Sequence, residues 1–325
     1  MKDFPDSSGE NCFLEIIRNW IFHQTGQSLE ESYLYMVSGS FDFQYSAEWV
    51  SETEVFPKVD IVQKYRYDYY PTWLGISLTM VTPQNAKIGW EQIQTELNAG
   101  NIPIVRIDAS KLPDMVDKKT ATYMVVHRYN ESEETVGVSS LFYNGQLPLS
   151  TLTACREAIS IYGLPAHSWL KLQVVKEILT RDPSSLYKFV CTILCQDPKT
   201  GESIQNNINA FSDILQILTD LPTLLVRIQM HNLSNQFFHP LGPPESRKKM
   251  LQILKILHNA NYLSIDTVSQ YEKISSDWDL LKMLLYRSTI GQPKEALERI
   301  QDRLRNIGKL EKEAYEQILH EIKVK

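Results

Sequence analysis

The spacing of apolar residues changes character near residue 165 of this 325-residue chain. Before that point, segments with helical spacing alternate with short β-rich segments, and after it helical spacing continues nearly to the end. The first helix is predicted over residues 12–25 and ends at Gly26, a residue typical of helix C-termini. Its apolar positions recur at intervals of mostly three and four: Phe13, Ile16, Ile17, Trp20 and Ile21. A helix is therefore expected ahead of the first predicted strands.

Three β-rich segments come after a further predicted helix at 88–98, which ends near Gly100. The three segments are 101–108, 120–129 and 135–142. The polar residues 130–134 join the last two as a hairpin, which makes those strands antiparallel. A helix then follows Pro148. Helix first and sheet afterwards within one unit predicts an α+β fold with an antiparallel sheet.

The second half of the chain is predicted to be all-helical. The helices expected there are 169–180, 184–196, 205–219, 245–259, 265–288 and 293–322, the last broken at Gly308. These patterns predict two domains, 1–164 with the sheet and 165–325 with the helices, and the chain is long enough for two cores.

Charge and composition exclude several functional classes. The net charge of −6 disfavours a nucleic-acid partner, because phosphate binding requires a basic face. Residues 1–20 carry acids and no basic run before an apolar core, so no secretory leader is predicted, and no apolar stretch is long enough to span a bilayer. A cytoplasmic protein with reduced thiols is expected.

The motifs that hold cofactors are missing from the sequence. No phosphate loop or dinucleotide-binding glycine pattern is present, so no cofactor is expected. Cys191 and Cys195 share one face of a predicted helix, but no nearby pair of His or Cys residues completes a metal site. Both are expected to be buried core thiols. Asp108 is expected to end a strand and cap a turn.

Cys12 is the candidate for chemistry, in the stretch S-S-G-E-N-C-F-L-E. A helix N-terminus lowers the pKa of a thiol through the helix dipole, and its unpaired backbone N–H groups can hold a developing oxyanion. The alternative is a small core residue, because cysteine is among the most often buried residue types. A catalytic role requires a general base and a group that orients it.

Several separated stretches carry a family resemblance. They are G-E-N-C at 9–12, G-Q-S-L-E-E-S-Y-L-Y-M-V-S-G-S-F-D-F at 26–43, A-G-N-I-P-I-V-R-I-D-A-S-K-L-P at 99–113, the hairpin 123–145, P-E-S-R-K-K-M-L-Q-I-L at 244–254 and S-S-D-W-D-L-L-K-M-L at 275–284. Together they resemble the butirosin biosynthesis protein H family. The resemblance implies a papain-like N-terminal domain and a helical C-terminal domain.

The resemblance also implies an activity. A family member moves an aminoacyl group from an acyl carrier protein to an aminoglycoside amine, through a thioester on its cysteine. By this resemblance the chain is an acyltransferase of specialised-metabolite biosynthesis, such as that of antibiotics. Its nucleophile is Cys12, and its partners are an acyl or peptidyl carrier protein and a small-molecule amine.

Two positions depart from the family pattern. Thr122 occupies the position of the family's catalytic His, and Ser140 replaces its orienting Asp. A Thr hydroxyl cannot act as a general base near neutral pH, and Ser supplies no negative charge. Other histidines offered as bases are His127, His167 and His239. His127 is predicted to point to the sheet face opposite Thr122, unless a β-bulge intervenes.

Three hypotheses follow from these residues. The chain is an active cysteine acyltransferase, or a catalytically degenerate papain-like protein that serves as a binding or scaffolding partner. In the third, Cys12 acts alone, because thioesters are reactive enough for exchange with a thiolate and the acceptor amine can serve as the base.

Overall fold

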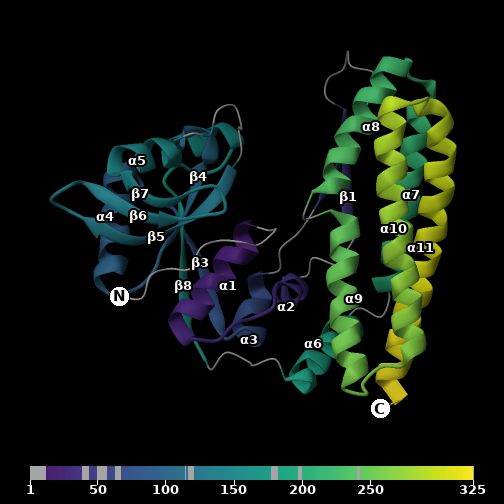
Figure 1. Ribbon diagram of the computed structural model, residues 1–325, viewed down its shortest axis with the longest axis horizontal. Coiled ribbons are helices and arrows are strands. Elements are labelled where there is room, and N and C mark those ends of the chain that lie inside the picture. The colour runs from purple at the N-terminus through teal and green to yellow at the C-terminus, as the bar shows by residue number, and fades with distance from the viewer. Residues whose placement is uncertain are drawn as a thin grey trace. The chain divides into compact units, whose positions relative to one another are not determined.

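The structure is a computed structural model that describes residues 12–38, 44–49, 57–62, 67–113, 115, 121–176, 182–196, 200–239 and 242–324 (Figure 1). The chain divides into two compact units. The first is Met1–Leu34 with Tyr67–Thr180, and the second is Tyr35–Arg66 with Arg181–Lys325. The expected domain boundary between residues 164 and 165 falls inside the first unit.

The first unit is built on a six-stranded antiparallel sheet with the order β3-β8-β4-β5-β6-β7. The strands are β3 (Ile76–Val81), β4 (Ile104–Asp108), β5 (Ala121–Asn130), β6 (Thr135–Ser139), β7 (Asn144–Pro148) and β8 (Trp169–Val174). The α+β class and the three predicted strands are confirmed, because those segments form β4, β5 and β6. An N-terminal region with this sheet is followed by an all-helical C-terminal region.

The helix predicted at 169–180 is wrong, because this segment begins with β8. Trp169, Leu170 and Leu172 are buried in the strand, and β8 pairs with β3 on one side and with β4 on the other. The short stretch W-L-K-L, with three apolar residues of four, fits either the helical or the strand period, and its place between two strands decides the outcome.

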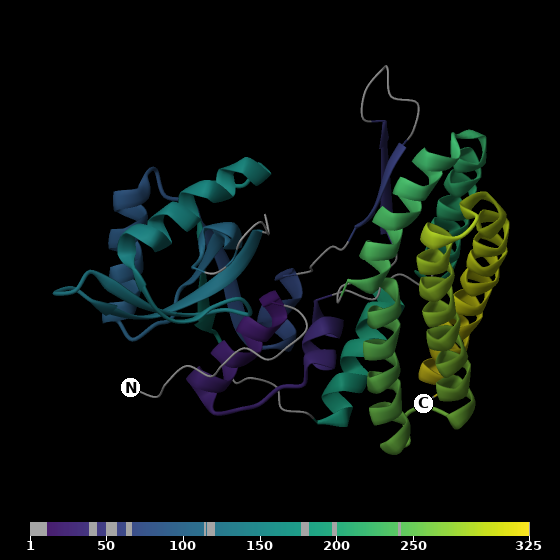
Figure 2. The same cartoon turned by 45° about the horizontal axis from the view of Figure 1, so that its top comes forward.

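The helical elements of the first unit cover both faces of the sheet. They are α1 (Cys12–Thr25), η1 (Tyr67–Tyr69), α3 (Tyr70–Trp73), α4 (Ala86–Asn98), η2 (Ala109–Lys111), α5 (Leu149–Ala158) and η3 (Ile159–Tyr162), while α2 (Glu31–Val37) crosses the division between the units. Residues of α4 and α5 share a core with β4 and β5, for example Ile93, Leu152, Val105 and Met124. Helix α1 packs on the other face, and Figure 2 shows it across the sheet from α5.

Helix α1 is buried on nearly all sides, as is typical of a helix in a protein interior. Even Glu15 and Asn19 are buried, and the Glu15 carboxylate accepts hydrogen bonds from Arg18 at 2.7 Å and from Asn19 at 3.3 Å. Both bonds are accepted by Oε1, and they offset part of the cost of burying this carboxylate. The sequence prediction of a helix at 12–25 is confirmed to the residue.

The second unit combines a β-hairpin with a bundle of helices. Its elements are β1 (Gln44–Trp49), β2 (Pro57–Val62), α6 (Pro183–Gln196), α7 (Thr200–Ile217), η4 (Leu218–Asp220), α8 (Thr223–Phe238), α9 (Pro243–Asn259), α10 (Ile265–Ile290) and α11 (Pro293–Val324). Strands β1 and β2 pair antiparallel, α7 packs along α11, and α10 packs against α8, α9 and α11 (Figure 1). The pattern missed α8, and it predicted the other helices.

Gly308 does not break the last helix, which corrects the expectation from the sequence. A Cβ atom at Gly308 would lie 3.4 Å from both Asn209 Oδ1 and Ile208 Cγ2 of α7. These are ordinary van der Waals distances, so Gly308 packs against α7 as an interior residue of a continuous helix.

One buried ion pair joins three helices of the second unit. Arg247 of α9 donates from Nε to Glu311 Oε1 of α11 at 2.6 Å, and Trp278 of α10 donates from Nε1 to the same oxygen at 2.8 Å. Arg247 also donates from Nη1 to Ser246 Oγ at 2.8 Å, and its guanidinium lies over the Trp278 ring. Burial alone would lower the pKa of Arg247, but the Glu311 carboxylate outweighs burial and holds this pKa above its ordinary value.

Replacing Glu311 with Gln should lower the free energy of unfolding by about 3 kcal/mol, because a buried guanidinium would lose its counter-charge. Asp213→Asn is the matched control, since Asp213 pairs with Arg305 on the surface at 3.2 Å, and its loss should cost less than about 1 kcal/mol. Urea unfolding followed by helical circular dichroism measures both. Equal midpoints for the two variants would contradict the importance of the buried pair.

Candidate functional site

Cys12 is half-buried and is the first residue of α1. The backbone N–H groups of a helix's first turn have no partner within the helix, so the thiol lies at the end where those groups point outward. Its neighbour Phe13 packs on Tyr123 of β5, with ring centroids 4.7 Å apart, and on Tyr67, with centroids 5.4 Å apart. Residues 9–11 of the G-E-N-C stretch lie outside the described residues, as does Gly39.

Arg106 of β4 joins Tyr123 on this face of the sheet. The strand register pairs the two residues, and Arg106 donates from Nε at 3.2 Å and from Nη2 at 3.0 Å to the Tyr123 hydroxyl. The guanidinium carbon also lies 5.3 Å from the centre of the Tyr123 ring. Sequence reasoning missed both side chains. The alternation of side chains along β5 could have indicated them. Because Met124 points into the buried core, its neighbour Tyr123 points to the opposite face, toward α1.

Thr122 lies on the opposite face of the sheet from Tyr123. It pairs with Ile107, whose side chain belongs to the core beneath α4 and α5. Its side chain is 3% exposed, and its hydroxyl has no hydrogen-bond partner among the residues that the structure describes. Alternation along β5 therefore does not bring Thr122 to the α1 face, where Cys12 begins the helix.

The Ser140 hydroxyl is engaged in the turn that leads from β6 to β7. Its oxygen accepts hydrogen bonds from the backbone N–H groups of Phe142 at 3.2 Å and Tyr143 at 3.1 Å. It donates to the Tyr143 carbonyl oxygen at 3.2 Å. One donor and two acceptor positions are all that a hydroxyl offers, so Ser140 stabilises this turn and has no capacity left to orient a base.

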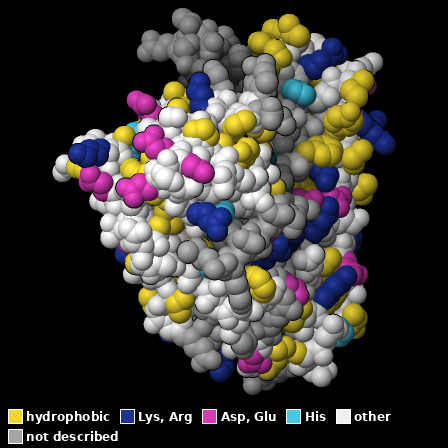
Figure 3. Space-filling model, turned by 60° about the vertical axis from the view of Figure 1, so that its left-hand side comes forward, with side chains coloured by type: hydrophobic (Ala, Val, Ile, Leu, Met, Phe, Trp, Pro, Cys, Tyr) yellow, Lys and Arg dark blue, Asp and Glu magenta, His cyan; other side chains and the backbone are white. Residues whose placement is uncertain are grey.

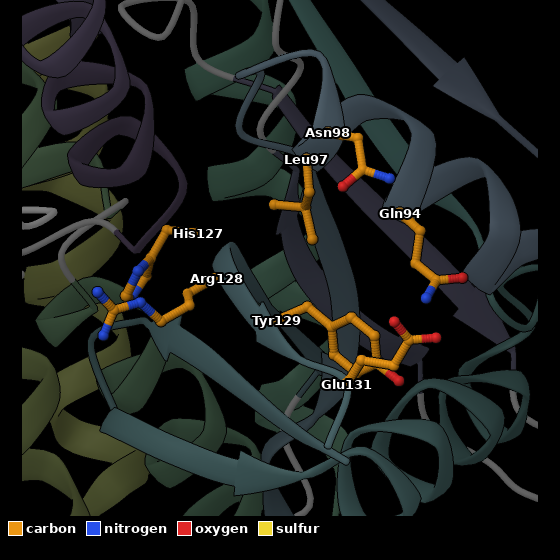
Figure 4. A pocket seen from close by; sticks show the side chains of 7 residues that line it. All are labelled: Gln94, Leu97, Asn98, His127, Arg128, Tyr129 and Glu131. Carbon is orange, nitrogen blue, oxygen red and sulfur yellow. The ribbon is translucent and has the colours of Figure 1, made fainter. Parts of the chain in front are cut away.

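His127 forms a β-bulge in β5 and lines a pocket of about 310 Å³ between this strand and α4 (Figure 4). Val126 pairs with Val138 and Arg128 pairs with Gly137, so His127 is the extra residue of the strand. The imidazole lies against Gly137, where a Cβ atom would approach its Cε1 to 2.9 Å. The bulge comes after Val126, so the side chains of residues 121–126 still alternate regularly between the two faces of the sheet. His127 lies four residues beyond Tyr123, roughly 13 Å along the strand.

The other two candidate bases belong neither to α1 nor to the strand on which it packs. His167 is buried in the connection between η3 and β8, and its backbone has a left-handed φ of 56°. Arg156 fixes this conformation, because its Nη2 donates to the His167 carbonyl oxygen at 2.5 Å. Burial and then Arg156 lower the pKa of His167. His239 is exposed at the end of α8 in the second unit.

Asp108 has the structural role that the sequence predicts. It ends β4, and its Oδ1 accepts a hydrogen bond from the backbone N–H of Ser110 at 2.9 Å, which caps η2. Burial and then the Asp108 charge raise the pKa of Cys155 to about 11. Cys155 is therefore an inert core thiol, and Cys12 is the more accessible of the two thiols in the first unit.

Comparisons with known proteins assign no function to this chain. The chain matches no model of a protein family and no curated protein. Among the described residues, no group of three His, Cys, Asp or Glu side chains is placed to hold a metal ion. Across those same residues, every helix is too short or too polar to cross a bilayer. Figure 3 shows acidic, basic and hydrophobic side chains interspersed over the face it presents.

The Cys155 thiol should make stability fall in alkaline solution. Its pKa is about 11 in the folded chain, against 9.0 for an ordinary thiol, so the folded state holds more protons between these values. The free energy of unfolding therefore decreases as the pH rises from about 9 to 11. Urea titrations across this window should show a flatter decrease for Cys155→Ala than for the parent chain. The same slope in both would contradict the raised pKa.

Proposed function

We propose that this chain is a cysteine-dependent acyltransferase of specialised-metabolite biosynthesis. It takes an acyl group from a carrier-protein thioester onto Cys12 and passes it to a small-molecule amine. The observation that carries this proposal is the placement of Cys12, a half-buried thiol at the first residue of a buried helix. A buried helix packed on the face of an antiparallel sheet also supports a papain-like arrangement for the first unit.

The transfer proceeds in two balanced steps. The Cys12 thiolate attacks the thioester carbonyl carbon, a C–S bond to Cys12 forms, and the C–S bond to the carrier breaks. The carrier leaves as a thiolate and takes up the proton that Cys12 released. The acceptor amine then attacks the new thioester, an amide C–N bond forms, and the Cys12 thiolate leaves and accepts the amine's proton.

This version of the reaction requires no histidine. Thr122 faces the other side of the sheet and Ser140 is engaged in a turn, so neither takes the Cys12 proton. The leaving carrier thiolate and the acceptor amine serve as the bases instead. In this proposal the N–H groups of the first turn of α1 stabilise the negative charge on the thiolate and on the tetrahedral oxyanion. Arg106, which donates to Tyr123 on the sheet face that α1 covers, adds positive charge to that face.

The second candidate is a binding partner of the same pathway that lacks catalysis. The hydrogen bonding of Ser140 and the orientation of Thr122 favour it, because neither side chain is placed to activate Cys12. Both candidates share the fold and the carrier partner. They differ in whether Cys12 becomes acylated.

Incubation of the full chain with an acyl-loaded carrier protein should add one acyl group to Cys12, detected by mass spectrometry of the intact protein and its peptides. Cys12→Ala should abolish the adduct. Cys191→Ala is the matched control, since Cys191 is also a half-buried thiol on a helix, and this variant should acylate as the parent does. Arg106→Gln should slow acylation about tenfold, the loss expected when one hydrogen bond to a charged group is removed.

Thr122→Val separates the proposal from a conventional triad. The substitution keeps the volume of a side chain on the far face of the sheet, so acylation should proceed at the parent rate. A large loss in Thr122→Val, with the fold intact, would show that Thr122 participates. Absence of the adduct together with co-elution of the carrier would favour the binding partner.

A further inference from the structure

Two neighbouring helices of the second unit, α8 and α10, expose an apolar surface. The helices pack side by side in opposite directions (Figure 1). Phe238 near the end of α8 meets Tyr286 of α10, with ring centroids 5.8 Å apart, and Arg227 near the start of α8 donates from Nη2 to the carbonyl oxygen of Gly291 at 3.3 Å. We call this surface the α8–α10 face and define it by six exposed apolar side chains: Leu224, Ile228, Phe238, Met283, Tyr286 and Ile290.

The exposed apolar residues of the α8–α10 face form two stripes with helical spacing. On α10 the intervals between them are three and four residues, and on α8 Ile228 follows Leu224 after four. The stripes are well exposed at one end, where the side chains of Leu224 and Ile290 are 67% and 72% exposed. Single exposed apolar residues are normal on a protein surface, but a contiguous patch of them is typical of a binding surface.

The charged residues of the α8–α10 face are basic. Residues 223–238 and 280–290 contain two arginines and one lysine but no Asp or Glu, although the whole chain has a net charge of −6. Arg227 and Arg287 are exposed, and neither forms an ion pair with any residue that the structure describes. Both bond to the backbone of Gly291, so they lie together at the end where α8 begins and α10 ends.

This combination of charge and apolar area distinguishes among occupants. A second copy of the chain would bring its own arginines to the interface, and the two helix segments offer no carboxylate to meet them. An anionic bilayer binds clusters of about four to eight basic residues. The lysine of this face, Lys282, is already paired with Asp279 at 3.3 Å, which leaves two arginines. An acidic partner with an apolar stripe fits both features of the face.

We infer that the α8–α10 face binds an acidic amphipathic helix of a partner protein. The apolar stripe of that helix packs along the stripes of α8 and α10, and its carboxylates pair with Arg227 and Arg287. Leu224 and Phe238 lie about 21 Å apart along α8, so the bound helix has about four turns. The inference is independent of acyl transfer at Cys12.

Fluorescence anisotropy titrations of the full chain with two labelled helical peptides test this face. Both peptides carry the same stripe of leucines at intervals of three and four, and the residues that flank the stripe are Glu in one peptide and Lys in the other. The Glu peptide should bind about tenfold more tightly at low ionic strength, because its carboxylates pair with the two arginines. Added salt should reduce this difference, because the arginines are exposed to solvent.

The double variant Leu224→Ser, Ile290→Ser tests the apolar part of the face. It should weaken both peptides about tenfold or more, because two exposed apolar side chains no longer contact the bound helix. Ile161→Ser is the matched control, since Ile161 is 62% exposed and belongs to η3 of the first unit. This control should bind both peptides as the parent does.

The double variant Arg227→Gln, Arg287→Gln tests the charged part. It should weaken the Glu peptide about tenfold and leave the affinity for the Lys peptide unchanged or higher, because only the Glu peptide loses ion pairs. Arg128→Gln is the matched control, since Arg128 is an exposed arginine of β5 in the first unit. This control should bind the Glu peptide as the parent does.

Three results of these titrations would overturn the inference. They are the absence of binding of both peptides, equal affinity for the two, and unchanged affinity in both double variants. Far-ultraviolet circular dichroism confirms that each variant is folded.

Two further assays distinguish the other occupants. Sedimentation of the parent chain alone detects a second copy, and flotation with vesicles of phosphatidylcholine and phosphatidylglycerol detects a membrane. Self-association or vesicle binding that Leu224→Ser, Ile290→Ser abolishes would overturn the inference and assign the face to that occupant. Failure here leaves the Cys12 acylation experiment unaffected, because that experiment measures a covalent adduct on a different residue.

Discussion

Strand β5 is packed on both of its faces, and this constraint determines which face of the sheet Thr122 and Tyr123 reach. Met124 and Val126 belong to the core beneath α4 and α5, while Tyr123 receives Phe13 of α1 on the other face. A shift of one residue would bury the wrong set on each side, so the register is strongly specified. Tyr123, and with it Arg106, therefore lies on the face of the sheet that α1 covers, and Thr122 does not.

The second unit depends on a comparable constraint in helical form. Arg247, Trp278 and Glu311 come from three different helices and meet at one carboxylate oxygen. These hydrogen bonds can form together only when the three helices are aligned in one register. The ion pair therefore specifies how α9, α10 and α11 align. Gly201 of α7, where a Cβ atom would lie 2.9 Å from the Tyr315 Cβ, adds a second fixed point on α11.

The sequence predicted much of the fold, and it predicted the candidate site only in part. Helix α1 and strands β4, β5 and β6 were predicted from the periodicity of their apolar residues. The periodic pattern of the helix extends over more than one turn, and that of each strand over more than one pair of residues. Strand β8 was not, because a stretch with only three apolar residues of four fits a helix or a strand until its two neighbouring strands are known. Cys12 was found from the helix start, whereas Tyr123 and Arg106 required the register of β4 against β5. The bulge at His127 is equally invisible in the sequence, because it is defined by the partner strand.

Strand β4 begins opposite Val125, so residues 127–130 of β5 run past its end and form an open edge of the sheet. A regular strand in that position presents evenly spaced donors and acceptors to any other extended chain, and such edges promote aggregation. The bulge at His127 interrupts this spacing, and the charges of Arg128 and Glu131 flank it. The irregularity thus protects the unit against strand addition by another copy. Removing the bulge would therefore be expected to lower the solubility of the chain by exposing a regular strand edge.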